Sequence, residues 1–154
     1  MAGRSEEINL DDTDRRLVAL LADDARLSVN ELAARANVSR ATAYARFERL
    51  RRRVIRGFTA RVDPEALGYG LAALVLVHIE QRAWQEARDD LLAIPGVEYM
   101  AFTSGEFDVV LLVRVHDIAA LRDVVLQQLH GLPFIRSTRT IFVLDEHHRN
   151  LASL

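Results

Sequence analysis

The chain has 154 residues, half of them apolar, with a formal net charge of −2 and no cysteine. This length and composition allow one domain or two small ones, and the modest net charge argues against intrinsic disorder. The lack of cysteine excludes disulfides, thiol nucleophiles and cysteine-ligated zinc, and the longest apolar run, residues 71–77, is too short to cross a bilayer. The N-terminus has no apolar segment typical of export, so we expect a cytoplasmic protein.

The charges are unevenly distributed along the chain. Residues 28–61 contain nine arginines and two acidic residues, a formal charge of +7, whereas residues 62–154 contain seven arginines and thirteen acidic residues, or −6. All twenty basic residues are arginine, so every cationic contact is made by a planar guanidinium that can bind an anion in bidentate fashion. Segregated charge of this kind is typical of a protein that places one end on a polyanion.

The first part of the chain predicts three helices. Residues 11–24 carry leucines at helical spacing after an acidic start. The sequence Ser-Val-Asn-Glu at residues 28–31 is a capping box that opens a second helix, and Asn37 suits the left-handed turn after it. Ser39 is then the N-cap of a third helix that runs to about Arg53. The spacing turns four side chains of this helix inward: Ala43, Phe47, Leu50 and Val54.

A β-like segment comes next at residues 54–62, where Gly57 predicts the turn of a short hairpin, or wing. Residues 63–70 are typical of a linker, because the residue before Pro64 is pushed out of the helical region and two glycines loosen the end of the segment. We therefore expect one domain at residues 1–62 and a second at residues 71–154.

The second domain alternates strands and helices in the order βαββαβ. The predicted elements are a strand at 71–80, a helix at 84–94, strands at 97–104 and 107–115, a helix from Asp117 to about His130, and a strand at 135–146. The first strand is nearly all apolar, which predicts burial on both faces. Residues 74–78 match residues 112–116 at an offset of 38, and the same offset relates the next helix and strand of each copy. Two copies of a strand–helix–strand unit build the split βαβ, or ferredoxin-like, fold.

The third helix is the candidate DNA-binding element. A helix-turn-helix presents its second helix to the major groove, and the exposed amides at a helix N-terminus favour phosphate. We expect the N-terminal residues to meet bases and the later arginines to line the phosphate backbone. The candidate residues are Ser28, Ser39, Arg40, Thr42, Tyr44, Arg46, Arg49, Arg52, Arg53 and Arg56. The plain alternative is a solvated basic helix that only covers a core.

Seven short segments, spread over nearly the whole chain, match one known family in order. They are residues 10–14, 27–33, 38–42, 54–60, 63–68, 103–108 and 137–140. In these segments the chain resembles the Lrp/AsnC (leucine-responsive/asparagine regulator) family of prokaryotic transcription factors. The resemblance implies an α+β protein with an N-terminal winged helix-turn-helix and a C-terminal ferredoxin-like sandwich of the RAM type. It also implies homodimers, often four of them in an octamer, and gene control modulated by an amino acid or a related metabolite.

One departure from the family lies at the end of the third helix. Members usually have a glycine there, whereas residues 50–55 of this chain are one residue shorter and lack it. A glycine ends a helix in the left-handed conformation at little cost. Its absence predicts a frayed or differently angled exit and altered contacts between the wing and DNA. The extra arginines, in place of the family's usual acidic pair, imply stronger and less selective binding.

In family members the effector lies between neighbouring dimers, against the turn that residues 105–108 match here. Free amides and a hydroxyl can hold a carboxylate, and an acidic side chain can accept an ammonium group. The candidate effector residues are Gly105, Glu106, Asp108, Thr138 and Thr140. The structural alternative is a hairpin turn in which Gly105 supplies a positive φ and Asp108 a local hydrogen bond.

Other functional classes find less support. His78 and His116 occupy equivalent repeat positions, and adjacent parallel first and third strands could bring them together. Zinc needs at least three protein ligands, however, and no third is evident, so we expect no metal and no cofactor. No nucleophile or acid–base pair stands out, so we expect no enzyme. The alternative to a sequence-specific regulator is a nucleoid-associated protein that organises DNA with little site discrimination. The expected partners are double-stranded DNA, a small-molecule effector and further copies of the chain, with no membrane.

Overall fold

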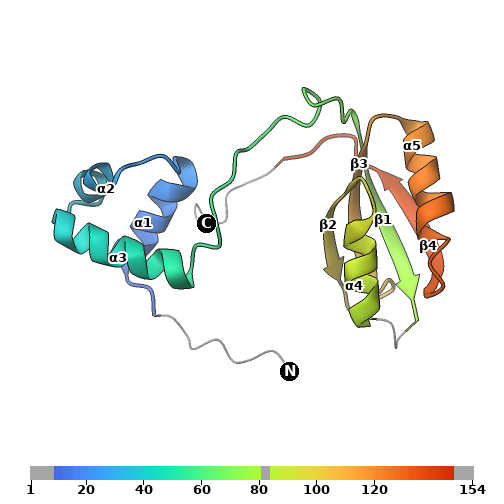
Figure 1. Ribbon diagram of the computed structural model, residues 1–154, viewed down its shortest axis with the longest axis horizontal. Coiled ribbons are helices and arrows are strands. Elements are labelled where there is room, and N and C mark those ends of the chain that lie inside the picture. The colour runs from blue at the N-terminus through green and yellow to red at the C-terminus, as the bar shows by residue number, and fades with distance from the viewer. Residues whose placement is uncertain (1–8, 81–83, 148–154) are drawn as a thin grey trace. The chain divides into compact units, whose positions relative to one another are not determined.

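The computed structural model describes residues 9–80 and 84–147. The prediction that the N-terminus has no export segment concerns residues outside this range. The chain divides into two compact units, one around residues 9–60 and the other at Arg61–Glu146 (Figure 1). Among the described residues, no helix is both long and apolar enough to cross a membrane. Because the two units are not placed relative to one another, each is described by itself.

The first unit is a bundle of three helices, as predicted. They are α1 (Asp12–Asp23), α2 (Val29–Ala36) and α3 (Arg40–Arg53). Asp11 and Ser28 each open a helix with a complete capping box, and the Ser39 hydroxyl accepts from the amide of Thr42. Asn37 ends α2 with φ 57° and ψ 49°, the left-handed turn that its side chain tolerates. The expected caps and turn are confirmed.

Leucines from all three helices form the core of this unit. The buried cluster consists of Leu17, Leu21, Leu32, Ala36 and Leu50. Of the four α3 residues predicted to face inward, Ala43 and Leu50 are fully buried, whereas Phe47 and Val54 are half-buried. The helical period of the sequence therefore identifies the packed face of α3 correctly, and it leaves most of the arginines on the outer faces.

A buried carboxylate joins α1 to α3. Asp14 is the only charged residue in the described part of the chain that is fully buried. Its side chain accepts from Arg46 Nη1 at 3.0 Å, from Arg49 Nη2, and from the backbone amide of Asp11 at 3.2 Å. Asp11 also accepts from Arg46 Nη1, at 2.6 Å, and this hydrogen bond lowers the pKa of Asp11. Two arginines of α3 are thus held by acidic residues at the start of α1.

The predicted wing is absent, and this part of the prediction is wrong. Residues 55–62 contain no strand. The helix α3 ends at Arg53, and its C-cap residue Val54 has φ −120° and ψ −49°, so the exit lacks a left-handed cap, as the missing glycine predicts. The Leu50 carbonyl instead accepts from the amides of both Val54 and Ile55 at 2.8 Å. Phe58 and Val62 are exposed, and a hairpin without apolar cover is marginal in water.

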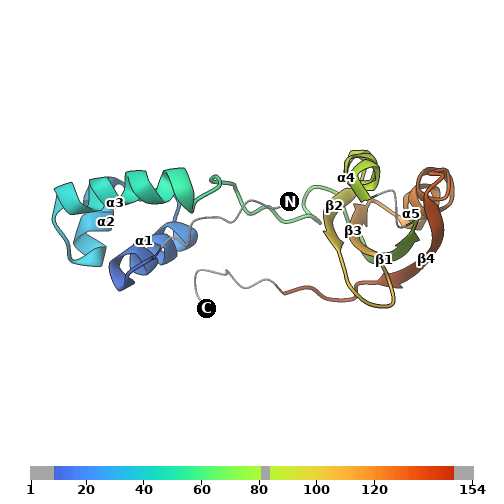
Figure 2. The same ribbon diagram turned by 90° about the horizontal axis from the view of Figure 1, so that it is seen from below.

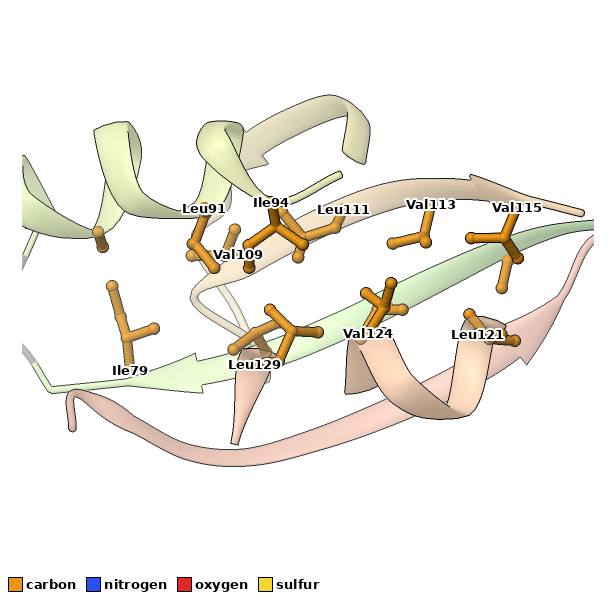
Figure 3. Close-up of a cluster of buried hydrophobic side chains, with 14 of the residues drawn as sticks. Ile79, Leu91, Ile94, Val109, Leu111, Val113, Val115, Leu121, Val124 and Leu129 are labelled. Atoms are coloured by element: carbon orange, nitrogen blue, oxygen red, sulfur yellow. The ribbon is translucent and has the colours of Figure 1, made fainter. Parts of the chain in front are cut away.

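The second unit contains a four-stranded sheet with its helices on one face (Figure 2). Its elements are β1 (Leu71–Ile79), α4 (Trp84–Ala93), β2 (Val97–Phe102), β3 (Val109–Val115), α5 (Ile118–Asp123), the π-helical continuation η1 (Val124–Leu129) and β4 (Ile135–Phe142). This is the predicted βαββαβ order. The spatial order of strands is β2-β3-β1-β4. Leu91 and Leu129, which match in the internal repeat, are both fully buried against the sheet (Figure 3).

The directions of two strands differ from the expectation. β1 and β3 are neighbours, as predicted, but they run antiparallel. Their register pairs Leu71 with Val115 and Val77 with Val109, so His116 and His78 belong to opposite ends of the sheet. The two histidines therefore do not meet. A strand–helix–strand–strand order makes the first and third strands antiparallel, because only the helical crossovers preserve strand direction.

Only one face of the sheet is covered. Along β1 the residues Ala73, Val75, Val77 and Ile79 are buried under the helices, while those between them are half-buried. The prediction that β1 is buried on both faces is therefore wrong for the single chain. The uncovered side, here called the open face, carries largely apolar side chains: Leu74, Leu76, Tyr99, Ala101, Val110, Leu112 and Ile141.

The segment predicted as a loose linker is anchored to the sheet unit. Residues 64–68 form a turn, and the Gly68 carbonyl oxygen lies 2.8 Å from His116 Nδ1. The Tyr69 ring stacks on the His116 imidazole with centroids 4.6 Å apart. Residues 64–69 therefore form a strap that contacts the end of β3. Any flexible part of the predicted linker lies before Pro64.

Gly96, at the turn between α4 and β2, cannot be replaced without strain. Its φ is +92°, and a Cβ there would lie 2.9 Å from the Arg114 carbonyl oxygen of β3. We expect Gly96→Ala to destabilise the sheet unit by about 1 to 3 kcal/mol, from the left-handed backbone and the clash together. Gly70→Ala is the matched control, because its Cβ would meet nothing within 4 Å. Hydrogen exchange of the β2 and β3 amides measures both variants, and equal protection in the two would contradict this interpretation.

Asp14→Asn tests the buried carboxylate. The amide cannot neutralise Arg46 and Arg49, so we expect the three-helix unit to lose on the order of 3 kcal/mol. The control is Asp12→Asn, an exposed residue in the same helical turn, which loses at most about 1 kcal/mol of helix-dipole stabilisation. Hydrogen exchange of the α1 amides reports on this unit, with the sheet amides as an internal reference. Asp14 is not structurally important if both variants exchange alike.

Candidate functional site

The N-terminal end of α3 presents a small set of outward side chains. The Ser39 and Thr42 hydroxyls lie 2.8 Å apart, and the Ser39 oxygen also accepts from the Thr42 amide at 3.1 Å, so both residues serve the cap. Arg40 is exposed beside them. Tyr44 lies one turn later on the same side of the helix and is 59% exposed. Arg40 and Tyr44 are therefore the predicted contact residues at this end that are exposed and take no part in the cap.

The other arginines predicted to contact DNA fall into two groups. Arg46 and Arg49 are held by Asp14, and their side chains are 28% and 48% exposed. Arg52 is 75% exposed, and Arg53 and Arg56 are exposed as well. The structure thus places Arg46 and Arg49 in the contact between α3 and α1 and leaves the arginines at the C-terminal end of α3 facing solvent.

Two further residues of this unit make hydrogen bonds within it. Ser28 lies in the capping box of α2, where its hydroxyl and its amide both donate to Glu31 Oε2, at 2.7 and 2.8 Å. These hydrogen bonds lower the pKa of Glu31. Glu48, which is not among the predicted contact residues, accepts from Arg51 at 3.1 Å and lies 3.7 Å from Arg52. The hydrogen bond from Arg51 lowers the pKa of Glu48. An acidic side chain therefore lies within the basic end of α3.

The turn between β2 and β3 is tied to the sheet by its own polar groups. Gly105 has a φ of +154°. The Asp108 carboxylate accepts from the Ile79 amide at 3.0 Å and lies 3.5 Å from His78 Nδ1. The Thr103 hydroxyl donates to the Phe107 carbonyl at 2.5 Å. Asp108 therefore has the structural contacts of a hairpin residue, and Glu106 is the acidic side chain of this turn that faces solvent.

The five predicted effector residues do not surround one point of a single chain. Thr138 and Thr140 pair with the buried Val77 and Val75, which places both threonines on the helix-covered face of β4. Thr138 Oγ1 lies 2.9 Å from His130 Nε2 at the end of η1. Asp108 contacts His78, between two buried β1 residues and hence on the open face. One copy of the chain thus supplies two separate halves of the predicted site.

Three side chains beside the turn are absent from the set predicted from sequence. His78 stacks on Phe107 with ring centroids 4.6 Å apart, and the Arg139 guanidinium lies 5.2 Å from the centroid of the Phe107 ring. Arg139 also lies 3.8 Å from Glu106. Phe107 belongs to the turn motif and Arg139 to the Thr-Arg-Thr segment, so both were visible in the matched segments. What brings them together is the β1–β4 register, which pairs Leu76 with Arg139 and which the sequence does not reveal.

A pocket of about 340 Å³ lies between the strap and the sheet. Its lining residues are Val62, Pro64, Leu67, Tyr69, Gly96, Val97, Glu98 and Arg114. Arg114 donates to Glu98 at 2.5 Å and to Glu146 at 2.6 Å, so its single positive charge is already paired with two carboxylates. The described residues contain no group of three or more histidines and acids that could hold a metal ion. The pocket thus offers shape and apolar surface, with no reactive group.

Comparison with known proteins identifies the family. The model of the AsnC-type helix-turn-helix domain matches residues 10–51, and that of the Lrp/AsnC ligand binding domain matches residues 72–152. The chain is 39% identical to the HTH-type transcriptional regulator LrpA of Mycobacterium tuberculosis over 145 residues, which cover 90% of this chain and 96% of that protein.

Solved structures give the same answer. The fold is similar to that of AsnC from E. coli, with a TM-score of 0.86 and 26% identity over 94% of this chain and 99% of that one. It is equally similar to the transcriptional regulator NMB0573 from Neisseria meningitidis, solved in complex with L-Met, with a TM-score of 0.86 and 26% identity over 94% and 96% of the two chains. The chain therefore belongs to the Lrp/AsnC family of helix-turn-helix transcriptional regulators.

Proposed function

We propose that this protein is a sequence-specific DNA-binding regulator that inserts α3 into the major groove. The observation that carries the proposal is the exposed surface at the start of α3. Arg40 and Tyr44 lie on this surface, within the first turns of the helix, in a segment with a formal charge of +7. Arginine in this position can bind guanine in bidentate fashion, and the helix N-terminus favours a phosphate. Arg52, Arg53 and Arg56 then supply contacts to the backbone. Ser39 and Thr42 position the helix end through the hydrogen bonds of the cap.

The regulator is proposed to work as a homodimer built on the open face of the sheet. This face carries half-buried leucines, among them Leu74 and Leu112, that nothing covers in the single described chain. A second copy of the same antiparallel sheet is the occupant with matching shape, since sheets pack face to face about 10 Å apart. A two-fold dimer presents two α3 helices, so the DNA site should be roughly palindromic.

We further propose that an amino acid or a related metabolite modulates the protein through the β2–β3 turn. The relative NMB0573 was solved with L-Met, which supports an amino acid as the class of ligand. In this chain Glu106 is exposed and accessible to an ammonium group. Asp108 is already committed to the Ile79 amide, so it shapes the turn. Because the threonine half and the acidic half of the site lie on opposite faces, a complete site needs residues from more than one copy.

The DNA-binding proposal is tested by selection from a pool of randomised duplexes. We expect one roughly palindromic sequence to be enriched, and to bind at least about 4 kcal/mol more tightly than a scrambled duplex. A nucleoid-organising protein would instead enrich no sequence, which would overturn the proposal of specific binding. In the same assay Arg40→Ala should relax the preferred sequence, because it removes a base contact.

Arg52→Ala should leave the preferred sequence unchanged and flatten the dependence of log K on log salt by about 0.9, because it removes one phosphate contact. Arg122→Ala, on α5 of the other unit, is the control with the same change of charge, and it should do neither. Identical effects of the Arg40 and Arg52 variants on sequence preference and salt dependence would contradict this division of roles.

The effector proposal is tested by a thermal-shift screen of the twenty amino acids, with oligomer size measured alongside. A ligand at 100 times its Kd stabilises the native state by about 2.7 kcal/mol, so binding raises the melting temperature. We expect Glu106→Gln to reduce the shift caused by the ligand, because it removes the charge that pairs with the ammonium group. Glu86→Gln, on α4, should keep the full shift. If no amino acid changes the melting temperature, this ligand class is wrong.

A further inference from the structure

Glu48 is the one acidic residue on α3, and it lies among the arginines at the basic end of the helix. Its carboxylate accepts from Arg51 Nε at 3.2 Å and Nη2 at 3.1 Å, and it lies 3.7 Å from Arg52 Nη2. The three residues are spaced i, i+3 and i+4, so they are neighbours on one side of the helix. A single carboxylate thus faces two guanidinium groups.

Asp14 and Glu48 differ in burial, although both contact arginines of α3. Asp14 is fully buried and joins α3 to α1, so its arginines are part of the packing of the unit. The side chain of Glu48 is 25% exposed, while those of Arg51 and Arg52 are 54% and 75% exposed. Exposed pairs of this kind contribute at most about 1 kcal/mol to stability. The pairs of Glu48 are therefore weak enough to exchange with another oxyanion.

We propose that Glu48 acts as an internal competitor of DNA phosphate and sets the strength of the sequence-independent binding of α3. The inference rests on the proposed DNA-binding function and identifies a positioning residue within it. Carboxylate and phosphate bind a guanidinium through the same fork of N–H donors. Glu48 holds Arg51 by that fork, forms an ion pair with Arg52 at 3.7 Å, and cancels one of their two charges. The two arginines therefore act on the backbone as one net cation.

This arrangement separates affinity from base recognition along the helix. The residues that face the bases lie at the start of α3, around Arg40, two to three turns before Glu48. Each net phosphate contact changes the slope of log K against log salt by about 0.9. Glu48 thus lowers that slope by about one contact and leaves the base-reading end untouched. It offsets part of the strong, unselective binding that the arginine-rich sequence implies.

The test compares Glu48→Gln with the unchanged full-length chain on a random-sequence duplex, by fluorescence anisotropy over a salt series. We expect the slope of log K against log salt to steepen by about 0.9. On going from 1 M to 0.1 M salt, the affinity of the variant should therefore gain on the order of eightfold more than the affinity of the parent chain. Glu86→Gln makes the same change of charge on α4 and should match the parent chain. Circular dichroism melting confirms that each variant is folded before binding is measured.

A second background shows whether Glu48 acts through the two arginines. In a chain that carries Arg51→Ala and Arg52→Ala, the additional change Glu48→Gln should have no effect on the slope. A gain that persists in this background would mean that Glu48 merely repels phosphate, and the proposal would be overturned. An unchanged slope in the single variant would overturn it as well. If the parent chain itself shows no salt-dependent binding, the proposed DNA-binding function fails instead.

Discussion

The orientation of α3 depends on a buried carboxylate. Asp14 lies at the start of α1 without exposure to solvent, and its oxygens accept from Arg46 and Arg49. Removing one partner of a buried pair leaves an uncompensated charge in a region of low dielectric. The recognition helix is therefore fixed to the bundle by two contacts of defined direction in addition to its leucine packing. Every proposed contact with DNA relies on this fixed direction.

The arginines of α3 consequently do three different things, although the sequence presents them as one basic run. Arg46 and Arg49 hold the helix in place, Arg51 and Arg52 share the charge of Glu48, and Arg40 projects from the helix start. The formal charge of +7 for residues 28–61 overstates the field that DNA meets, because Asp11 and Asp14, which lie outside that segment, neutralise part of it. The number of arginines in a segment is thus a poor guide to the number of phosphate contacts.

Much of the fold could be predicted from local chemistry. The caps at Ser28 and Ser39, the left-handed Asn37 and the βαββαβ order depend on patterns within a few residues of each other. The absence of the wing could not be predicted from local patterns. A hairpin depends on apolar cover from other elements, which residues 55–62 lack. The direction of β3 follows from the βαββαβ order, so the parallel arrangement was a wrong reading of a correct order, whereas the pairing of Phe107 with Arg139 is a long-range fact set by strand register. The pairing of Asp14 with two arginines is also long-range, so these arginines were assigned to DNA alone.

The sheet unit leaves two surfaces incomplete in a single chain. Its open face carries apolar side chains that a second sheet packed face to face would bury. The two halves of the predicted effector site lie on opposite faces of the sheet in one chain. If a ligand binds only where copies meet, its binding energy must favour one assembly over another. Linkage then requires that DNA, which binds a particular spacing of α3 helices, change the affinity for the ligand by the same factor. The strap at residues 64–69, tied to His116 at the end of β3, anchors one end of the connection between the two units to this sheet.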